Sequence, residues 1–431
     1  MELLIQLIDR QLIRFMEENT EKKNSGFIKG LICGLLISAV AAGAFLILWA
    51  SNNKKKPGSD IIAEGGATFE SRLVDDRTIG KIKTVEYLID KYYLNEYTDK
   101  DVEEGIYKGM IDSLGDRYGE YYTREEVKEV REKTSGTFGG IGAYIGYNEE
   151  YECCVIAGTF TDSPAEKAGL REGDLIYMVD DTDVSSMDTS EVVDLVRGPE
   201  GSTVHMTLIR EGADDYIEVD IVREIIKSDT VHSEMKDDNI GYIQIEEFDT
   251  VTFEQFVDAL AVLKGQGARG IIIDLRSNPG GNLDTACDIA RYIVPKGLIC
   301  YTVDKYGEKV DYTCDGEHEL ELPLVILVNG YSASASEILT GAAKDHGKAR
   351  VVGTTTYGKG IVQTIVPLND GSAVKLTTSS YYTPNGTCIH GTGIDPDVEV
   401  ELDGKAYYED GKDNQLDAAM EEMHKIWESS Y

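Results

Sequence analysis

The sequence predicts a mixed α/β protein with a single N-terminal transmembrane helix, a β-rich middle domain and an α/β C-terminal core. Residues 31–50 contain no charged side chain, and a helix of that length crosses about 30 Å of hydrocarbon. Residues 139–225 show short β-like runs separated by glycine turns. From residue 239 onward, nearly continuous apolar strands alternate with helices, which is typical of a sheet covered on both faces.

The first 66 residues are expected to anchor the chain to a membrane. Residues 1–30 carry apolar side chains at helical spacing, which predicts an amphipathic segment. About thirty residues precede the apolar run 31–50, and that run exceeds the apolar core of a typical signal peptide, so an uncleaved anchor is favoured over a cleaved signal. Lysines flank both ends equally, so the positive-inside rule leaves the orientation open. The polar residues 51–66 are predicted to form a stalk.

Periodicity predicts the elements of the remaining chain, which divides into four regions: an N-terminal helical region (67–134), the β-rich domain (135–225), the core (226–402) and a C-terminal helix (403–431). The helical region has helical patterns at 77–113 and 123–133, and the β-rich domain has one helix at 190–196. Predicted core strands are 239–248, 268–277, 322–330 and 349–355, and predicted core helices are 252–264, 282–293 and 335–344.

The composition excludes several classes of function. With 42 Lys and Arg against 78 Asp and Glu, the net charge is −36; this acidic surface repels phosphate backbones and argues against nucleic-acid binding. The charge is uneven, because residues 1–56 are slightly basic and the remaining chain carries −39. The seven cysteines are odd in number and lack zinc-type spacing. No disulfide framework, metal site or cofactor is predicted.

The first chemical motif is the serine-rich run YSASASE at residues 331–337, directly after a predicted buried strand. Small residues let the backbone turn sharply from strand to helix and expose a hydroxyl at the helix N-terminus. Peptide N–H groups there point outward and can stabilise a developing oxyanion. An ordinary helix cap, with serine before glutamate, explains the same pattern.

Two glycine-rich loops follow other predicted strands. Lys359 lies between two glycines; a buried lysine has a lowered pKa and can accept a serine proton, although an exposed lysine on a glycine turn is the alternative. The segment DLRSNPGG at 274–281 ends in a glycine pair that lets the backbone approach a ligand closely.

His346 is the one histidine near the serines, and it fits the end of the predicted helix better than a catalytic base.

In their order and spacing, these three segments resemble the carboxyl-terminal processing peptidases, the tail-specific serine proteases of peptidase family S41. The resemblance extends from about Thr78 to Leu402. It implies that Ser334, twenty-five positions before Lys359, is the nucleophile and that Lys359 is the base. It also implies that Gln363 orients the lysine amine, and that the backbone N–H groups of Gly280 and Ala335 form the oxyanion hole.

The middle domain resembles a PDZ domain. The loop formed by Gly140, Ile141, Gly142 and Ala143 matches the carboxylate-binding loop of that domain, and residues 162–181 match its following helix and strand. The resemblance implies that the domain adds a peptide C-terminus to its sheet as an extra strand.

The expected protein is a membrane-anchored serine endopeptidase that recognises and cleaves the C-terminal regions of proteins with accessible C-termini. The resemblance places its catalytic body outside the cytoplasm and the amphipathic segment 1–30 inside it, on a single-pass anchor in the cell membrane. Two alternatives remain: a catalytically silent PDZ scaffold, and a serine hydrolase that uses Ser334 with His346. A homodimer is also possible, paired through the apolar segments 79–114 and 416–427.

Overall fold

The computed structural model describes residues 73–429 of the 431-residue chain. The predicted segments 1–30, 31–50 and 51–66 lie outside the described residues. Within residues 73–429, no helix combines the length and the apolar character needed to cross a bilayer. The transmembrane anchor therefore stays a prediction.

Three helices and a short strand form the first part of the described chain: α3 (Asp76–Tyr92), α4 (Asp99–Asp112), β1 (Glu120–Tyr122) and α5 (Arg124–Ser135). Polar side chains cap these helices. The Asp75 carboxylate accepts the Thr78 amide at 2.8 Å, and Thr123 and Glu126 form a capping box at the start of α5. The helices predicted in this region are confirmed, with the first pattern split into α3 and α4.

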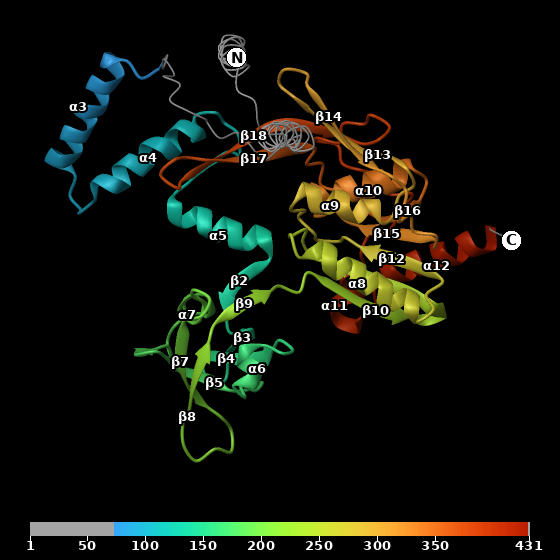
Figure 1. Cartoon of the computed structure of the whole chain (residues 1–431), viewed down its shortest axis with the longest axis horizontal. Coiled ribbons are helices and arrows are strands. Elements are labelled where there is room, and N and C mark those ends of the chain that lie inside the picture. Colours follow the sequence, from blue (N-terminus) through green and yellow to red (C-terminus); the bar gives the residue numbers. More distant parts are fainter. Residues whose placement is uncertain (1–72, 430–431) are drawn as a thin grey trace, which may run out of the picture. The chain divides into compact units, whose positions relative to one another are not determined.

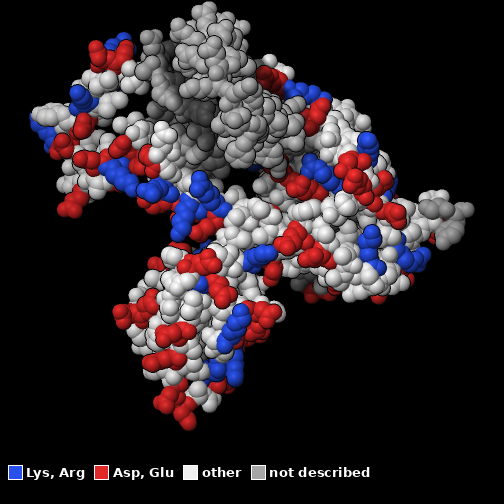
Figure 2. All heavy atoms as spheres, viewed as in Figure 1, with Lys and Arg blue, Asp and Glu red and all other residues white. Residues whose placement is uncertain are grey.

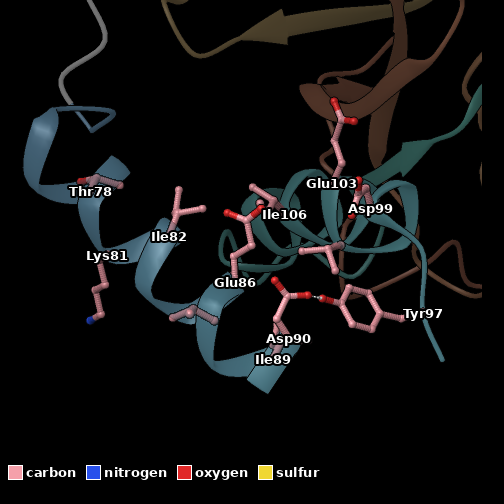
Figure 3. A pocket seen from close by; sticks show the side chains of 12 residues that line it. Thr78, Lys81, Ile82, Glu86, Ile89, Asp90, Tyr97, Asp99, Glu103 and Ile106 are labelled. Atoms are coloured by element: carbon pink, nitrogen blue, oxygen red, sulfur yellow. Dashed lines mark hydrogen bonds between the residues drawn. The ribbon is translucent and has the colours of Figure 1, made fainter. Parts of the chain in front are cut away.

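Helices α3 and α4 bury none of their own side chains. Their facing sides line a pocket of about 470 Å³, into which Ile82, Ile89 and Ile106 project (Figure 3). Asp90 and Tyr97 are hydrogen-bonded at the end of the pocket where the chain turns from α3 to α4 (Figure 3). The apolar stripes of these two helices are thus largely exposed.

The middle of the chain folds into a six-stranded antiparallel sheet in the order β3-β4-β5-β7-β8, with β6 paired to β5. Its elements are β3 (Ala143–Asn148), β4 (Cys153–Thr159), α6 (Pro164–Lys167), β5 (Leu175–Val179), β6 (Thr182–Asp183), α7 (Thr189–Val196), β7 (Thr203–Ile209) and β8 (Ile217–Val222). Ile156, Val204 and Leu208 are fully buried in a cluster drawn only from residues 141–221. The predicted β-rich domain therefore has its own hydrophobic core.

A two-stranded ribbon carries the chain into and out of this domain. Strands β2 (Thr137–Gly140) and β9 (Glu224–Lys227) pair antiparallel, with Thr137 opposite Lys227. The two connections therefore run side by side.

The C-terminal core is built on a six-stranded sheet in the order β10-β11-β12-β15-β16-β19 (Figure 1). Its strands are β10 (Val231–Lys236), β11 (Ile240–Ile245), β12 (Gly270–Asp274), β15 (Leu324–Val328), β16 (Ala349–Gly353) and β19 (Val398–Glu399). Strand β10 is antiparallel to β11, and every other neighbouring pair is parallel. A short 3₁₀ turn, η1 (Asp237–Asn239), joins β10 to β11.

Helices cover both faces of this sheet, as the sequence predicted. One face carries α8 (Thr252–Gly265), α9 (Leu283–Arg291) and α10 (Ala335–Asp345), and the other carries α12 (Asn414–Ser429). Alternate residues of one strand enter the two cores: Ile271 and Ile273 pack with the first set of helices, and Ile272 packs with α12. The short helix α11 (Gly404–Asp410) precedes α12.

The apolar face of α12 is used inside its own chain. Ala419 and Met423 are fully buried against the sheet. The expectation that segment 416–427 pairs two chains is therefore wrong, because this face covers the core.

A second sheet, five-stranded and antiparallel, was not predicted. Its order is β1-β18-β13-β14, with β17 paired to β18, and its further strands are β13 (Gly297–Asp304), β14 (Lys309–Cys314), β17 (Ile361–Pro367) and β18 (Ala373–Tyr382). Strand β18 reads AVKLTTSSYY and shows little apolar alternation, so its sequence signal is weak. This sheet pairs β1 with β18, which brings residues near 120 beside residues near 375.

Candidate active site

Ser334 lies at the sharp turn between β15 and α10 and caps the helix. Its backbone has φ 54° and ψ −111°, a conformation that non-glycine residues rarely adopt and that costs about 1–3 kcal/mol. The neighbouring serines are fully buried, and their hydroxyls donate to backbone carbonyls, Ser332 to Leu275 at 2.7 Å and Ser336 to Asn278 at 3.1 Å. Ser334 is only half-buried. Of the three serines, it is the one with solvent access.

The loop after β12 brings Gly280 against this turn. A Cβ on Gly280 would lie 2.7 Å from the Ala333 carbonyl oxygen, 2.8 Å from Ser334 Cβ and 3.0 Å from the Ala335 nitrogen, so only glycine fits. The two amides expected to form the oxyanion hole are thus neighbours. The Ala335 amide opens α10 and has no helical carbonyl to bond, whereas the Gly280 amide donates to Asn278 Oδ1 at 2.8 Å. Only the Ala335 donor is therefore already available.

A buried carboxylate joins the serine turn to the lysine loop. Glu337 Oε2 accepts the amides of Ser334 at 2.8 Å and Lys359 at 2.9 Å. Its Oε1 accepts the Thr356 hydroxyl at 2.6 Å and the Gly358 amide at 2.7 Å. Glu337 is fully buried. The backbones at Ser334 and Lys359 are therefore held by a single side chain.

Lys359 lies in the loop between β16 and β17 and is half-buried. Burial lowers the pKa of its amine, and the positive charges of Lys375 and Arg117 lower it further, while Glu337 acts in the opposite direction. The neutral form of the amine, which can accept a proton, is therefore favoured relative to an exposed lysine.

In this structure the lysine ammonium rests on an aromatic ring. Lys359 Nζ lies 4.7 Å from the centroid of the Tyr118 ring. Within the described residues, no hydrogen bond joins Nζ to the Ser334 hydroxyl. Contacts between a nucleophile and its base are often long without substrate, so this arrangement is compatible with a Ser334–Lys359 pair.

The PDZ-like loop joins β2 to β3, and its residues Gly140, Ile141 and Gly142 are buried. Gly140 ends β2 and Ala143 begins β3, and the carbonyls of Ile141 and Gly142 accept backbone amides at 2.8 and 2.9 Å. Gly142 has φ 73°. Among the described strands, β3 pairs only with β4, so its other edge can accept an added peptide strand. Helix α7 packs beside β3.

Comparison with known proteins identifies the family. The family model for peptidase family S41 matches residues 239–400, and a PDZ-domain model matches residues 160–210. The carboxy-terminal processing protease CtpA of Bacillus subtilis is 38% identical over 369 residues, which cover 85% of this chain and 76% of the relative. The chain belongs to peptidase family S41. It is a C-terminal processing serine protease with a PDZ domain.

Two further similarities accompany this assignment. The carboxy-terminal-processing protease of Bartonella bacilliformis is 38% identical to this S41 peptidase over 320 residues, covering 72% of each chain. A solved photosystem II D1 C-terminal processing protease is 31% identical, covering 73% of this chain and 86% of that chain, with a TM-score of 0.44.

Gln363 lies in β17, four residues beyond the lysine. Its side-chain amide donates to the Thr377 hydroxyl on β18 at 3.3 Å. No hydrogen bond connects it to Lys359 within residues 73–429, so its predicted role in orienting the lysine of this S41 peptidase stays a prediction.

His346 is far from the nucleophile, which disfavours the alternative histidine base. It caps the C-terminal end of α10, whereas Ser334 caps the N-terminal end. The eleven residues between them span about 16 Å at 1.5 Å per residue. The Nε2 atom of His346 lies 2.8 Å from the Leu298 carbonyl oxygen, with which it hydrogen-bonds.

The sequence reasoning overlooked two residues of this site, Glu337 and Tyr118. Glu337 had a visible signal, because it stands three residues after the capping serine, but the pattern indicates only a helix cap. Tyr118 lies in the segment SLGDRYGEYYT at 113–123, which belongs to the family resemblance. Its proximity to Lys359 could not be predicted, because it depends on the pairing of β1 with β18.

Proposed function

We propose that this S41 peptidase cleaves the C-terminal regions of proteins with a Ser334–Lys359 dyad. The single observation that carries the proposal is the Glu337 carboxylate, which binds the amides of both residues. The lowered pKa of Lys359 and the solvent access of Ser334 also support it.

The proposed mechanism is acyl transfer through a serine ester. The neutral Lys359 amine takes the proton of the Ser334 hydroxyl as its oxygen attacks the peptide carbonyl carbon. The Ala335 amide, joined by the Gly280 amide once it leaves Asn278, stabilises the oxyanion of the tetrahedral intermediate. The Lys359 ammonium then protonates the departing nitrogen as the C–N bond breaks. A water molecule, deprotonated by the same amine, hydrolyses the ester.

We infer that the PDZ domain holds the C-terminus of the substrate. An extended peptide adds to the free edge of β3, and its carboxylate is bound by the backbone of the loop 140–143. The open edge of β3 and the neighbouring helix α7 support this role.

The dyad is tested with single alanine variants and an unfolded test protein such as casein. Ser334→Ala and Lys359→Ala are each expected to lower kcat/KM by about 10³-fold or more, because both belong to one proton-transfer unit. Lys405→Ala, at an exposed position of α11, serves as the matched control and should be unaffected. Retained digestion by Lys359→Ala, or a loss with His346→Ala in a folded chain, would rule out the dyad.

We also propose that residues 31–50 anchor the peptidase in the cell membrane with its catalytic body outside the cytoplasm. The uncharged length of that segment supports this. The full chain should resist extraction from membranes by alkaline carbonate, and a chain lacking residues 1–56 should not. Added protease should reach the catalytic body in intact wall-stripped cells; protection of that body would contradict the orientation.

We further propose that two copies of the chain pair through α3 and α4. Ile82, Val85 and Met110 on these helices are 39%, 48% and 53% exposed, and the helices bury no residue in their own chain. A second copy of the same hairpin offers a matching apolar surface.

A further inference from the structure

The segment between α4 and β1 lies against the loop that carries the lysine. One pocket of about 430 Å³ is lined by Arg117 and Tyr118 of this segment and by Tyr357 and Gly358 of the lysine loop. Nothing in the proposed proton transfer so far uses this segment.

The segment is held firmly in place. Strand β1 follows it directly and pairs with β18, with Tyr121 opposite Val374. Lys375 on β18 donates to Glu120 Oε2 at 2.8 Å and to the Tyr122 hydroxyl at 2.6 Å. The Tyr118 side chain is therefore presented from an anchored turn.

Tyr118 meets the lysine through the face of its ring. Lys359 Nζ lies 4.7 Å from the ring centroid, inside the range of about 6 Å for a cation–π contact. The turn that carries Tyr118 is fixed by Asp116, whose carboxylate accepts the Tyr118 amide at 3.0 Å. The ring itself is half-buried, so it also shields the amine from water.

The Tyr118 ring has two effects on the pKa of the Lys359 amine, and they are opposite in direction. The ring face stabilises the ammonium form and raises the pKa of the amine. The bulk of the ring excludes water, which disfavours the charge and lowers the pKa. Together they hold the amine in one place while keeping its proton exchangeable.

We propose that Tyr118 is a positioning residue for Lys359, holding the general base on its ring and shielding it from water. The inference deepens the proposed function and rests on the Ser334–Lys359 dyad. It assigns a part in catalysis to the turn that precedes β1.

The pH profile of kcat/KM reports the proposed role. A lysine base must be neutral, so activity rises as the pH passes through its pKa. The charged groups that face Lys359 are Lys375 from β18, Arg117 beside Tyr118, and Glu337 from α10. Tyr357 and His390 line the adjoining pocket. All of them are kept unchanged in the test.

The test compares three replacements of Tyr118 in the full chain. Tyr118→Leu keeps apolar bulk but removes the ring, so the acid limb should move to lower pH by about 0.5–1 unit. Tyr118→Ala removes the ring contact and also admits water, so its acid limb should lie at higher pH than that of Tyr118→Leu. Both should lower kcat about tenfold with KM nearly unchanged. Tyr118→Phe keeps the ring and should restore the wild-type profile.

A matched control exists outside the site. Tyr306 carries the Lys305 ammonium 5.0 Å from its ring centroid, on the turn between β13 and β14. Tyr306→Leu removes the same kind of contact and should leave the profile unchanged.

Several results would overturn the inference. If both the Leu and the Ala variants keep the wild-type acid limb, Tyr118 has no part in the function of the base. If both shift it upward, the ring acts only by excluding water. If Tyr118→Leu does not fold, Tyr118→Trp is used in its place. The stronger cation–π contact of tryptophan should move the acid limb of the pH profile to higher pH. An acid limb at the wild-type pH would contradict the proposal. If Lys359→Ala stays active, the proposed Ser334–Lys359 dyad is wrong. If Lys359→Ala is inactive while the Tyr118 variants keep the wild-type pH profile, the dyad stands and only the role of Tyr118 is wrong.

Discussion

The buried carboxylate of Glu337 links two segments that lie far apart in the sequence. It binds the amide of Ser334 at the start of α10 and the amide of Lys359 in the loop after β16. Each of its two oxygens accepts two hydrogen bonds, three of them from backbone amides and one from the Thr356 hydroxyl. The Glu337 carboxyl group therefore holds the nucleophile turn and the base loop together.

Glu337→Gln tests this role. The replacement puts an NH₂ group opposite amide donors, so the free energy of unfolding should fall by about 1–3 kcal/mol. We expect kcat to fall by about 100-fold or more with KM within about twofold, because the dyad is misaligned. Steady-state kinetics and urea unfolding measure the two effects.

The control for this variant is Glu126→Gln. Glu126 fills the same place in the capping box of α5, where Thr123 donates to it at 2.7 Å. That change should cost a little stability and leave kcat unaltered. A normal kcat in a less stable Glu337→Gln enzyme would show that Glu337 is structural only.

Among single residues, the sequence predicted those whose separation along the chain is typical of the family. The order and separation of Ser334 and Lys359 pointed to the two residues through the family resemblance. The role of Glu337 arises from a contact across 22 residues, and the role of Tyr118 from a contact between the turn before β1 and the loop before β17. No local sequence pattern records either contact. The environment of Gln363 likewise depends on its neighbour on β18.

An aspartate side chain is buried where the end of α5 packs against the loop before α8. Asp249 is 6% exposed, and the Thr250 amide donates to the Thr134 carbonyl at 3.2 Å. A Cβ on Gly136, at the end of α5, would lie 2.9 Å from Asp249 Cβ. Burial raises the pKa of Asp249 to about 6, with Glu247 adding to the effect and Lys133 opposing it.

This raised pKa predicts a pH-dependent stability. The folded chain holds the Asp249 proton more tightly than the unfolded chain, whose aspartate has a pKa of about 3.9. The stability contributed by this group is therefore full below about pH 4 and is lost as the pH rises through about 6. Asp249→Asn should raise the free energy of unfolding by about 1–2 kcal/mol at pH 8 and have little effect at pH 4.

Urea unfolding at the two pH values measures this difference. Asp183→Asn is the control, because hydrogen bonds from Ser185 lower the pKa of that exposed carboxylate, so its replacement should not stabilise the chain at pH 8. An equal effect of Asp249→Asn at pH 4 and pH 8 would show that charge is not the cause.

Elements with strong periodicity were predicted well. The buried strands β12 and β15 and the helices α8 and α10 fall where apolar runs and helical spacing placed them. The strands β13, β14, β17 and β18 were missed, because their faces are half-buried and carry many polar residues. Such strands are stabilised by their neighbours and not by their own pattern.

For the molecule as a whole, the acidic charge is dispersed. Figure 2 shows Asp and Glu side chains scattered over the visible face of the PDZ domain and of the core, with Lys and Arg among them. This distribution suits solubility and disfavours binding to nucleic acid.

The proposed dimer gives a prediction at the same scale. Val85→Glu adds a charge to the exposed apolar face of α3, so it should shift the full chain in detergent from dimer to monomer in sedimentation equilibrium. Thr84→Glu is the control, because it adds the same charge at a neighbouring position that does not line the pocket, whereas Val85 does. This variant should leave the dimer intact. A wild-type chain that sediments as a monomer would contradict the pairing.

The sequence by itself determined the buried parallel strands and covering helices of the core and the β-rich character of the middle domain. Through ordered motifs it also indicated the family and the candidate nucleophile and base. Periodicity and spacing are local properties, so they can be read from one chain. Only the tertiary structure decided that α12 faces inward, that Glu337 binds both active-site segments and that Tyr118 lies against Lys359. These features depend on pairings such as Glu120 with Lys375, which form because the folded sheet brings distant residues together.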